Sequence, residues 1–322
     1  MGSRAPLDLL EVYVVSTKLS LEDWDTKSIQ NASAMFKNTK AFNQPLSRLF
    51  KKGSGVSYSL TDTSSMFEGS EVFNQYINPW DMVKVENASA MFKNAKAFNQ
   101  PIASLFKKDS GVSYSLTDAS SMFEGAEVFN QYIQNWDTKS IQNASAMFKN
   151  TKAFNQPLGL LFKKGSGVSY SLTDASSMFE GAEVFNQHIE GWDMVKVEDV
   201  SAMFKNNDAF NKPLASWFKK DSSVTYAVTN MESMFEGSVF NLDLSGPDND
   251  NDAGWDTSTV ENMSYMFKNI PVTLDYSVDR ILQRAVSSGT LKKSKDFLYG
   301  TNMRKGWNDT HSSKFSATTS LS

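Results

Sequence analysis

A Met-Phe pair recurs along most of the chain and constrains its fold more than any other feature. The pair occurs nine times, at Met35, Met66, Met91, Met122, Met147, Met178, Met203, Met234 and Met266. An aliphatic residue stands six positions before each Met, Asn or Asp stands four before it, and Asn or Gly stands three after it. Such self-similarity is the signature of a repeat architecture in which each unit stacks on its neighbours.

The polar columns around each pair predict a short helix. Asn and Asp are strong helix N-caps, and Gly and Asn tolerate the left-handed conformation that ends a helix. In the fourth unit these signals predict a helix from Asp118 to Gly125, which is about two turns at 3.6 residues per turn. A helix so short is marginal alone, so stacking on neighbouring units must hold it.

Two kinds of link connect the units and define a larger repeat. A Trp-Asp pair stands in the short link at Trp24, Trp80, Trp136, Trp192 and Trp255, and the first three intervals are 56 residues. The long link, as in residues 49–60, carries a Lys-Lys pair before a Gly-rich turn. Val56, Tyr58 and Leu60 alternate there with serines, which predicts a hairpin or arc on one edge of the array. The Trp-Asp aspartates are expected to close Asx turns after a buried Trp.

The flanks depart from the repeat, so we divide the chain into four regions. Residues 1–23 are predicted to be an N-terminal cap, 24–270 the repeat solenoid, 271–310 a C-terminal cap and 311–322 a disordered tail. Apolar residues at helical spacing predict a capping helix over residues 276–286. The expected architecture has a parallel sheet along one face and short helices along another.

The segment from Trp136 to Phe148 and the preceding Phe-Asn-Gln at 129–131 carry a resemblance to a known family. They resemble the BspA-like leucine-rich-repeat surface proteins, in the form common in mycoplasma lipoproteins, and the similarity extends from Trp24 to Asn269. The resemblance implies an α/β solenoid, a leucine-rich-repeat-like stack of about nine units, each with a short strand and a short helix. It also implies a surface or adhesive role and supplies no catalytic residues. The long Lys-Lys-Gly link departs from the family pattern.

Charge and composition narrow the function classes. The net charge of −4 argues against a general nucleic-acid or membrane-surface role. No apolar run approaches the length of a transmembrane segment, and the N-terminus lacks the pattern of a signal peptide. The absence of cysteine removes disulfides, thiolate metal sites and cysteine nucleophiles. No cofactor is expected, and a cell-surface or secreted location follows from the resemblance alone.

Most polar candidates favour structural roles over catalysis. The Asn that follows the second Phe of each unit, such as Asn130, is expected to satisfy backbone groups of adjacent turns. His188 replaces Tyr76 and Tyr132 at one repeat position, which argues against a catalytic base. The acidic run at residues 248–252 resembles an EF-hand loop but lacks the acidic twelfth residue, so a surface insertion is favoured over a calcium site. We therefore expect a non-enzymatic protein without a metal site.

Two periodic features are the candidate binding residues. The long links carry Lys51, Lys52, Lys107, Lys108, Lys163, Lys164, Lys219 and Lys220, at 56-residue spacing. With sheet strands about 4.8 Å apart, successive pairs would lie roughly 10 Å apart. We favour the interpretation that these lysines lie in solvated turns and prevent the sheet edge from pairing with another chain. The alternative is that they form a row of binding sites for a repeating anionic polymer. Met82-Val83 and Met194-Val195 occupy slots that hold Thr-Lys elsewhere, so they are expected to be exposed and to contact protein.

These features predict a protein that binds partners, or assembles into a larger structure, through its long regular surface. The leading hypothesis is a binding or adhesion module of a microbial cell surface, with a protein or glycan partner along the repeats and no nucleic acid. The alternative is a structural or scaffold subunit that assembles with itself or with other proteins. A partner that follows the repeats would bind through many linked weak contacts, which raises avidity.

Overall fold

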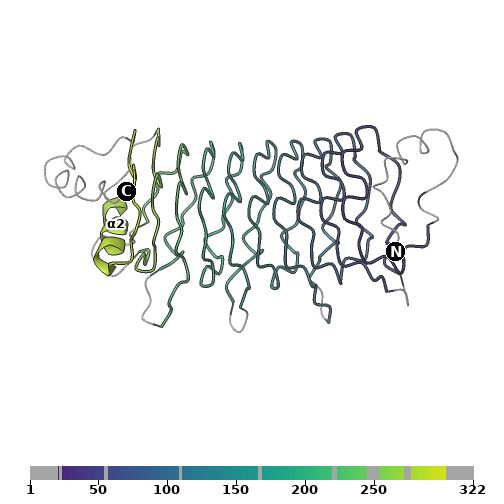
Figure 1. Ribbon diagram of the computed structural model, residues 1–322, viewed down its shortest axis with the longest axis horizontal. Coiled ribbons are helices and arrows are strands. Elements are labelled where there is room, and N and C mark those ends of the chain that lie inside the picture. The colour runs from purple at the N-terminus through teal and green to yellow at the C-terminus, as the bar shows by residue number, and fades with distance from the viewer. Residues whose placement is uncertain are drawn as a thin grey trace, which may run out of the picture.

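The structure is a computed structural model that describes residues 21, 24–53, 57–108, 111–165, 169–219, 223–244, 254–271 and 277–301. In this part of the chain, successive units lie side by side in a long stack whose two ends are far apart (Figure 1). Parallel β-bridges join each unit to the next, in the order Asn31, Asp62, Asn87, Asp118, Asn143, Asp174, Asp199, Asn230, Asn262 and Lys293. The units are thus stacked in the order of the sequence.

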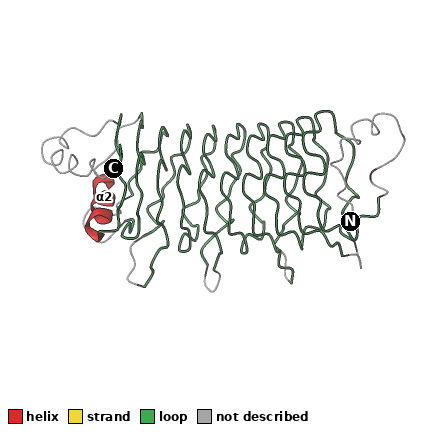
Figure 2. Cartoon of the chain, viewed as in Figure 1, coloured by secondary structure: helices red, strands yellow, loops and turns green. Residues whose placement is uncertain are grey.

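The short helix predicted in each unit is absent from the described units, and tight turns take its place (Figure 2). In the fourth unit, turns at residues 119–122 and 123–126 are closed by backbone hydrogen bonds of 3.3 and 3.0 Å. The third residues of these turns, Ser121 and Gly125, have φ of 53° and 67°. This is the geometry of type II β-turns, and a positive φ every fourth residue excludes an α-helix. The prediction of a helix in this segment is wrong.

The backbone hydrogen bonds explain why turns replace the helix. Every second N–H from Ala119 to Gly125 donates to a carbonyl of the fifth unit, at 2.8 to 2.9 Å. The N–H groups between them close turns within their own unit. A two-turn helix would satisfy few of its own backbone groups. The stack satisfies them by sharing hydrogen bonds between neighbouring units.

The Asn/Asp column forms Asx turns instead of helix caps. Oδ1 of Asp118 accepts the N–H of Ser120 at 2.9 Å. Such a turn needs only a short side-chain oxygen two residues before the donor, which Asn and Asp provide equally. The Asx turn predicted after a buried Trp is confirmed at Asp81, whose Oδ1 accepts the N–H of Val83 at 3.3 Å. Trp24, which is 43 % exposed, is the exception to the burial.

The Asn/Gly column alternates for a packing reason. Asn94 and Gly125 both have a positive φ, 57° and 67°, a conformation that Gly and Asn adopt most readily. A Cβ on Gly125 would lie 2.2 Å from Oδ1 of Asn94 in the preceding unit. The same clash would recur at Gly69, Gly181, Gly237 and Gly300. Each Asn side chain therefore fills the space that the Gly of the next unit leaves open.

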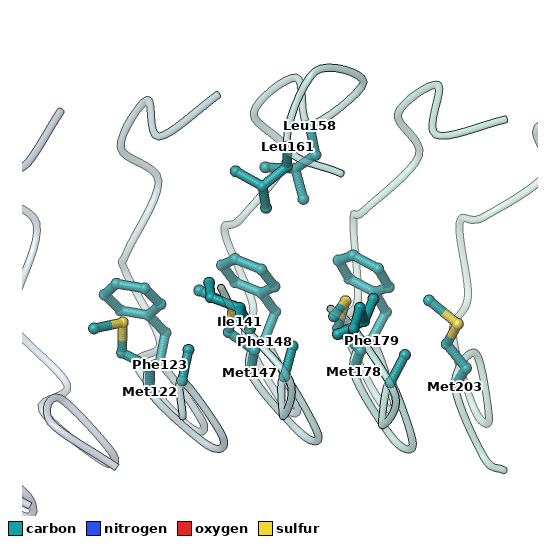
Figure 3. Close-up of a cluster of buried hydrophobic side chains, with 14 of the residues drawn as sticks. Met122, Phe123, Ile141, Met147, Phe148, Leu158, Leu161, Met178, Phe179 and Met203 are labelled. Carbon is teal, nitrogen blue, oxygen red and sulfur yellow. The ribbon is translucent and has the colours of Figure 1, made fainter. Parts of the chain in front are cut away.

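The core is built on two phenylalanine columns, as the repeats predict. Phe123 stacks on Phe148 of the next unit with ring centroids 5.7 Å apart, and on Phe129 of its own unit at 4.0 Å. Figure 3 shows Phe123, Phe148 and Phe179 in parallel with the methionines beside them. These rings are fully buried, and stacked aromatic pairs add to the free energy of burial.

Helix α2, Ser277–Ser288, lies at the C-terminal end of the stack (Figure 1). The helix predicted at residues 276–286 is therefore present. Ile281, Leu282 and Ala285 are buried in the common core. Arg284 donates from Nη1 to the carbonyl of Trp255 at 2.7 Å, which ties α2 to the preceding coil.

A tenth unit follows α2 at residues 293–300 and continues the stack. Lys293 forms a parallel bridge with Asn262, and Phe267 N–H donates to Phe297 O at 3.0 Å. The repeat pattern does not reveal this unit, because Lys replaces Asn or Asp and Phe297-Leu298 replaces Met-Phe. The stacked region thus continues beyond residue 270, the predicted C-terminal end of the repeats.

Several predictions fall outside the described residues. They concern the N-terminal cap apart from Leu21, the tail at 311–322, the acidic run at 248–252, Val56 of the first long link and Lys220. In the described part of the chain, no helix combines the length and apolarity needed to cross a membrane.

Candidate functional site

The long links project from one edge of the stack, at the bottom of Figure 1. We call their described lysines the lysine edge: Lys51, Lys52, Lys107, Lys108, Lys163, Lys164 and Lys219. The first lysine of each link forms an antiparallel bridge with the Trp of the next short link, as Lys107 does with Trp136. Lys108 N–H donates to Asn135 O at 2.8 Å. These contacts fix the backbone of the edge while the lysine side chains stay exposed.

A second set of lysines is neutralised by glutamates. We call it the Lys–Glu column, in which Lys37–Glu68, Lys93–Glu124, Lys149–Glu180 and Lys205–Glu236 pair between neighbouring units at 2.8 to 2.9 Å. Burial alone would raise the pKa of Glu236, but hydrogen bonds from Lys205 and Ser233 outweigh it and the pKa lies below its ordinary value. The column is therefore a set of charge-assisted contacts between neighbouring units at the surface of the stack.

The lysine edge has no such partners. Across the described segments, none of its seven lysines lies in an ion pair. Its charges therefore add to one another along the edge and attract anions over about 8–10 Å at physiological ionic strength.

A cleft of about 410 Å³ lies between the second and third long links. Lys107 and Lys108 line it from one link, and Lys163 and Lys164 line it from the next. The structure thus brings together two of the lysine pairs that the sequence singles out. The volume falls within the range of about 300–1,000 Å³ that is usual for small-molecule sites.

The interior of the cleft contains a buried carboxylate. Asp137 is 7 % exposed, and its Oδ1 accepts the N–H of Lys139 at 3.5 Å. Tyr170 also lines the cleft. Burial raises the pKa of its phenol, and the charges of Asp137 and Asp193 raise it further, so the phenol stays protonated at neutral pH.

One wall of the cleft is apolar. Leu160 lines it and is 44 % exposed. The same position in the other long links holds Arg48, Ser104 and Ser216. This departure from the repeat distinguishes the cleft from the other inter-link positions, and it is the sequence signal that could have identified the site. The interpretation of Asp137 as a turn residue alone missed its place in the cleft.

The apolar pairs that were expected to contact a partner are placed differently. Met82 and Met194 are 1 % and 2 % exposed, and Val83 and Val195 are half-buried against the core. Their expected exposure is therefore wrong. The first position of the pair points into the stack, where Thr138 is also buried and donates from Oγ1 to the carbonyl of Leu161. Only the second position, which holds Lys in other units, faces outward.

The remaining polar candidates have structural partners. The Asn ladder is confirmed: Asn130 N–H donates to Oδ1 of Asn99 at 2.9 Å, and the ladder is half-buried. His188 is exposed, with Nδ1 at 3.1 Å from the Glu190 carboxylate. No group of three His, Asp or Glu side chains that could hold a metal ion occurs among the described residues.

Comparison with family models places most of the repeats in one family. Residues 10–115, 110–165 and 173–273 match the model described as "Mycoplasma protein of unknown function, DUF285". A search of curated proteins and a search of solved structures each found no match to the chain. The three matched segments cover well over half of the chain and include all nine of its Met-Phe pairs. The chain therefore belongs to the DUF285 family, a repeat-containing family of Mycoplasma-type proteins of unknown function.

Proposed function

We propose that this protein is a non-enzymatic binding module that holds an extended anionic partner along the lysine edge. We further propose that it acts in adhesion at a microbial cell surface, and that its stack is a leucine-rich-repeat-like solenoid of the BspA-like type. The family match supports a repeat protein of the Mycoplasma type. The finer assignments rest on the resemblance and on the arrangement of charge.

The observation that carries the proposal is the contrast between paired and unpaired lysines. Lys93 and Lys149 are held by glutamates of the next unit. Lys107 and Lys163 have no ion pair in the described structure, yet their backbones are fixed by bridges to Trp136 and Trp192. An ordered row of unpaired ammonium groups is suited to bind anionic groups in a defined register.

The periodicity of the edge favours a polymer over a small molecule. A lysine pair occurs once in every 56-residue block, so a partner that follows the stack meets the same charge repeatedly. Each exposed contact is weak, but linked contacts raise the overall affinity. An anionic glycan provides such repeated charges with little internal structure to oppose the fit.

The proposal is tested by measuring how affinity depends on ligand length. The full chain is titrated with polygalacturonate fragments of increasing length and with neutral dextran, at low and high salt. We expect affinity to rise with fragment length and to fall with salt, because each added contact is electrostatic. Equal affinity for short and long fragments, or binding of dextran as tight as that of polygalacturonate, would contradict the proposal.

A second candidate function is assembly with copies of itself, as a structural or scaffold subunit. Its support is a periodic apolar surface formed by Val72, Tyr76, Val128, Tyr132 and Val184, each 40–46 % exposed. Exposed apolar side chains that recur along one protein are candidates for protein contacts. Sedimentation of the full chain at rising concentration tests this candidate. Self-association that is lost on Tyr76→Ser with Tyr132→Ser would support it, and a monomer at all concentrations would exclude it.

A further inference from the structure

We propose that the cleft between the second and third long links binds an acidic sugar unit, a ring that carries hydroxyl groups and one anionic group. This inference rests on the proposed function and names the chemical class of the partner at one place on the lysine edge. Three features of the cleft recognise three parts of such a ring.

The first feature is positive charge on two sides of the cleft. Lys107 and Lys108 come from one link, and Lys163 and Lys164 come from the next. No ion pair neutralises them in the described structure. With one carboxylate in the lining, Asp137, the four ammonium groups leave an excess of positive charge. An anionic group of a ligand is therefore attracted into the cleft.

The second feature is the Asp137 carboxylate, which is buried and poorly satisfied. Its one hydrogen bond within the described structure, from the N–H of Lys139, is long at 3.5 Å. A buried carboxylate is stabilised by additional donors. Sugar hydroxyls supply such donors, whereas an ionised carboxylate or phosphate without hydroxyl groups supplies none. The cleft is thus suited to an anion whose body carries hydroxyl groups.

The third feature is Leu160, an exposed apolar side chain in the wall of the cleft. Sugar rings present C–H groups on their faces, and burial of apolar surface contributes about 25 cal/mol per Å². The equivalent residues Ser104 and Ser216 offer no such surface. Leu160 therefore adds an apolar contact at this cleft that the equivalent serines do not supply.

Two other polyanions fit the cleft less well. Single-stranded nucleic acid is usually held by stacking of bases on exposed aromatic rings, but Trp136 and Tyr170 of the cleft are 2 % and 6 % exposed. An acidic peptide such as polyglutamate can offer backbone N–H donors to Asp137, but it has no sugar ring whose C–H face could pack against Leu160. Both polyanions are useful as competitors in the test.

The test uses the full chain and a galacturonic acid trimer, which is short enough to report on one cleft. Leu160→Ser introduces the residue that other links already have, and Asp137→Asn keeps the Oδ1 that closes the turn. Val286→Ser, on the exposed side of α2, and Asp256→Asn are the controls, because they make comparable polar substitutions away from the cleft. Calorimetric affinities are measured for all five proteins, and a thermal melt of each verifies folding.

We expect Asp137→Asn to weaken trimer binding about tenfold, because hydrogen bonds to a charged group are stronger than those to a neutral one. Leu160→Ser should weaken it severalfold, because the apolar contact with the ring is lost. The two controls should bind like the unchanged protein. A sulfated dextran fragment tests whether the anionic group must be a carboxylate. In either form, a charged sugar should bind tighter than polyglutamate or single-stranded DNA of equal charge.

The outcomes separate this inference from the proposed function. If polygalacturonate binds in a length-dependent way but trimer affinity is unaffected by Leu160→Ser and Asp137→Asn, the cleft proposal is overturned and the edge proposal stands. If polyglutamate or DNA binds as tightly as the sugars, the chemical class is wrong. If no polyanion binds, both proposals fail.

Discussion

The Lys–Glu column and the lysine edge use the same residue for opposite purposes. In the column, Lys149 meets Glu180 of the next unit at 2.8 Å. At the edge, Lys163 meets no carboxylate in the described structure, although its backbone is bridged to that of Trp192. The comparison shows that the repeat can neutralise a lysine when a neighbouring unit supplies an acid at the right position. The edge lysines therefore lack partners in spite of an ordered backbone.

The difference has a simple origin in the two kinds of link. Every unit contributes to the column, and Lys and Glu alternate there from one unit to the next. Long links occur in every second unit, and the short link between them offers the Trp-Asp aspartate and, in one copy, Glu190, which lies beside His188. That aspartate closes an Asx turn; for example, Oδ1 of Asp193 accepts the N–H of Val195 at 3.3 Å. We therefore expect substitutions in the stacked units to affect stability and substitutions at the edge to affect binding.

The largest expected effect on stability is in the core of the stacked units. Phe123→Ala should lower the free energy of unfolding by about 3–5 kcal/mol, because it leaves a cavity in a fully buried aromatic column. Lys163→Ala at the edge should change it by less than about 0.5 kcal/mol. Urea unfolding of both variants measures the difference. Similar small changes in both would mean that the phenylalanine columns are not the core.

A smaller loss is expected at the Asn/Gly column. Gly125→Ala forces a positive φ on Ala and places its Cβ against Oδ1 of Asn94, so a loss of about 1–3 kcal/mol follows. Gly165→Ala in the third link is the control, because a Cβ there meets nothing within 4 Å. A thermal melt compares the two. Equal melting temperatures would show that the close approach of Asn94 and Gly125 is not maintained in solution.

The Lys–Glu column also predicts a pH dependence of stability. The pKa of Glu236 is lowered from 4.5 in the folded protein, so its contribution is present above that pH and is lost as the pH falls through the lowered value. Unfolding midpoints measured between neutral pH and about pH 3 should fall. The Glu236→Gln variant should lose less on acidification than the unchanged protein, and an identical loss would argue against the ion pair's contribution.

The repeat pattern alone predicts the units, their order, the phenylalanine columns and the edge that carries the lysines. It does not distinguish a helix from stacked turns, because Asp118 suits both an N-cap and an Asx turn, and Gly125 suits both a helix end and a type II turn. The two differ in where the intervening N–H groups donate. That choice depends on the carbonyls of the next unit, which lie 24 or 30 residues away along most of the stack.

The candidate site was predicted in part for a similar reason. The lysines are visible as a periodic column, but the cleft forms only when two links are brought side by side. Asp137 looks like every other Trp-Asp aspartate in the sequence, and its burial depends on the neighbouring link. The predicted exposure of Met82 is wrong because it rests on the lysine of the equivalent Thr-Lys pair. Met82 corresponds to the threonine of that pair, Thr26, which is itself buried. A repeat position next to an exposed residue need not itself be exposed.

The most direct test compares two variants that lose the same charge from the two lysine sets. Lys163→Ala with Lys164→Ala removes two charges from the edge, and Lys149→Ala with Lys205→Ala removes two from the column. Affinity for polygalacturonate and the urea unfolding midpoint are measured for both. We predict that the edge variant binds about tenfold or more weakly and that its unfolding midpoint is unchanged. The column variant should keep its affinity but unfold at a lower urea concentration, because each lost ion pair lowers the free energy of unfolding by about 0.2–1 kcal/mol. An equal loss of affinity in both variants would contradict the account, because net charge and not the lysine edge would then govern binding.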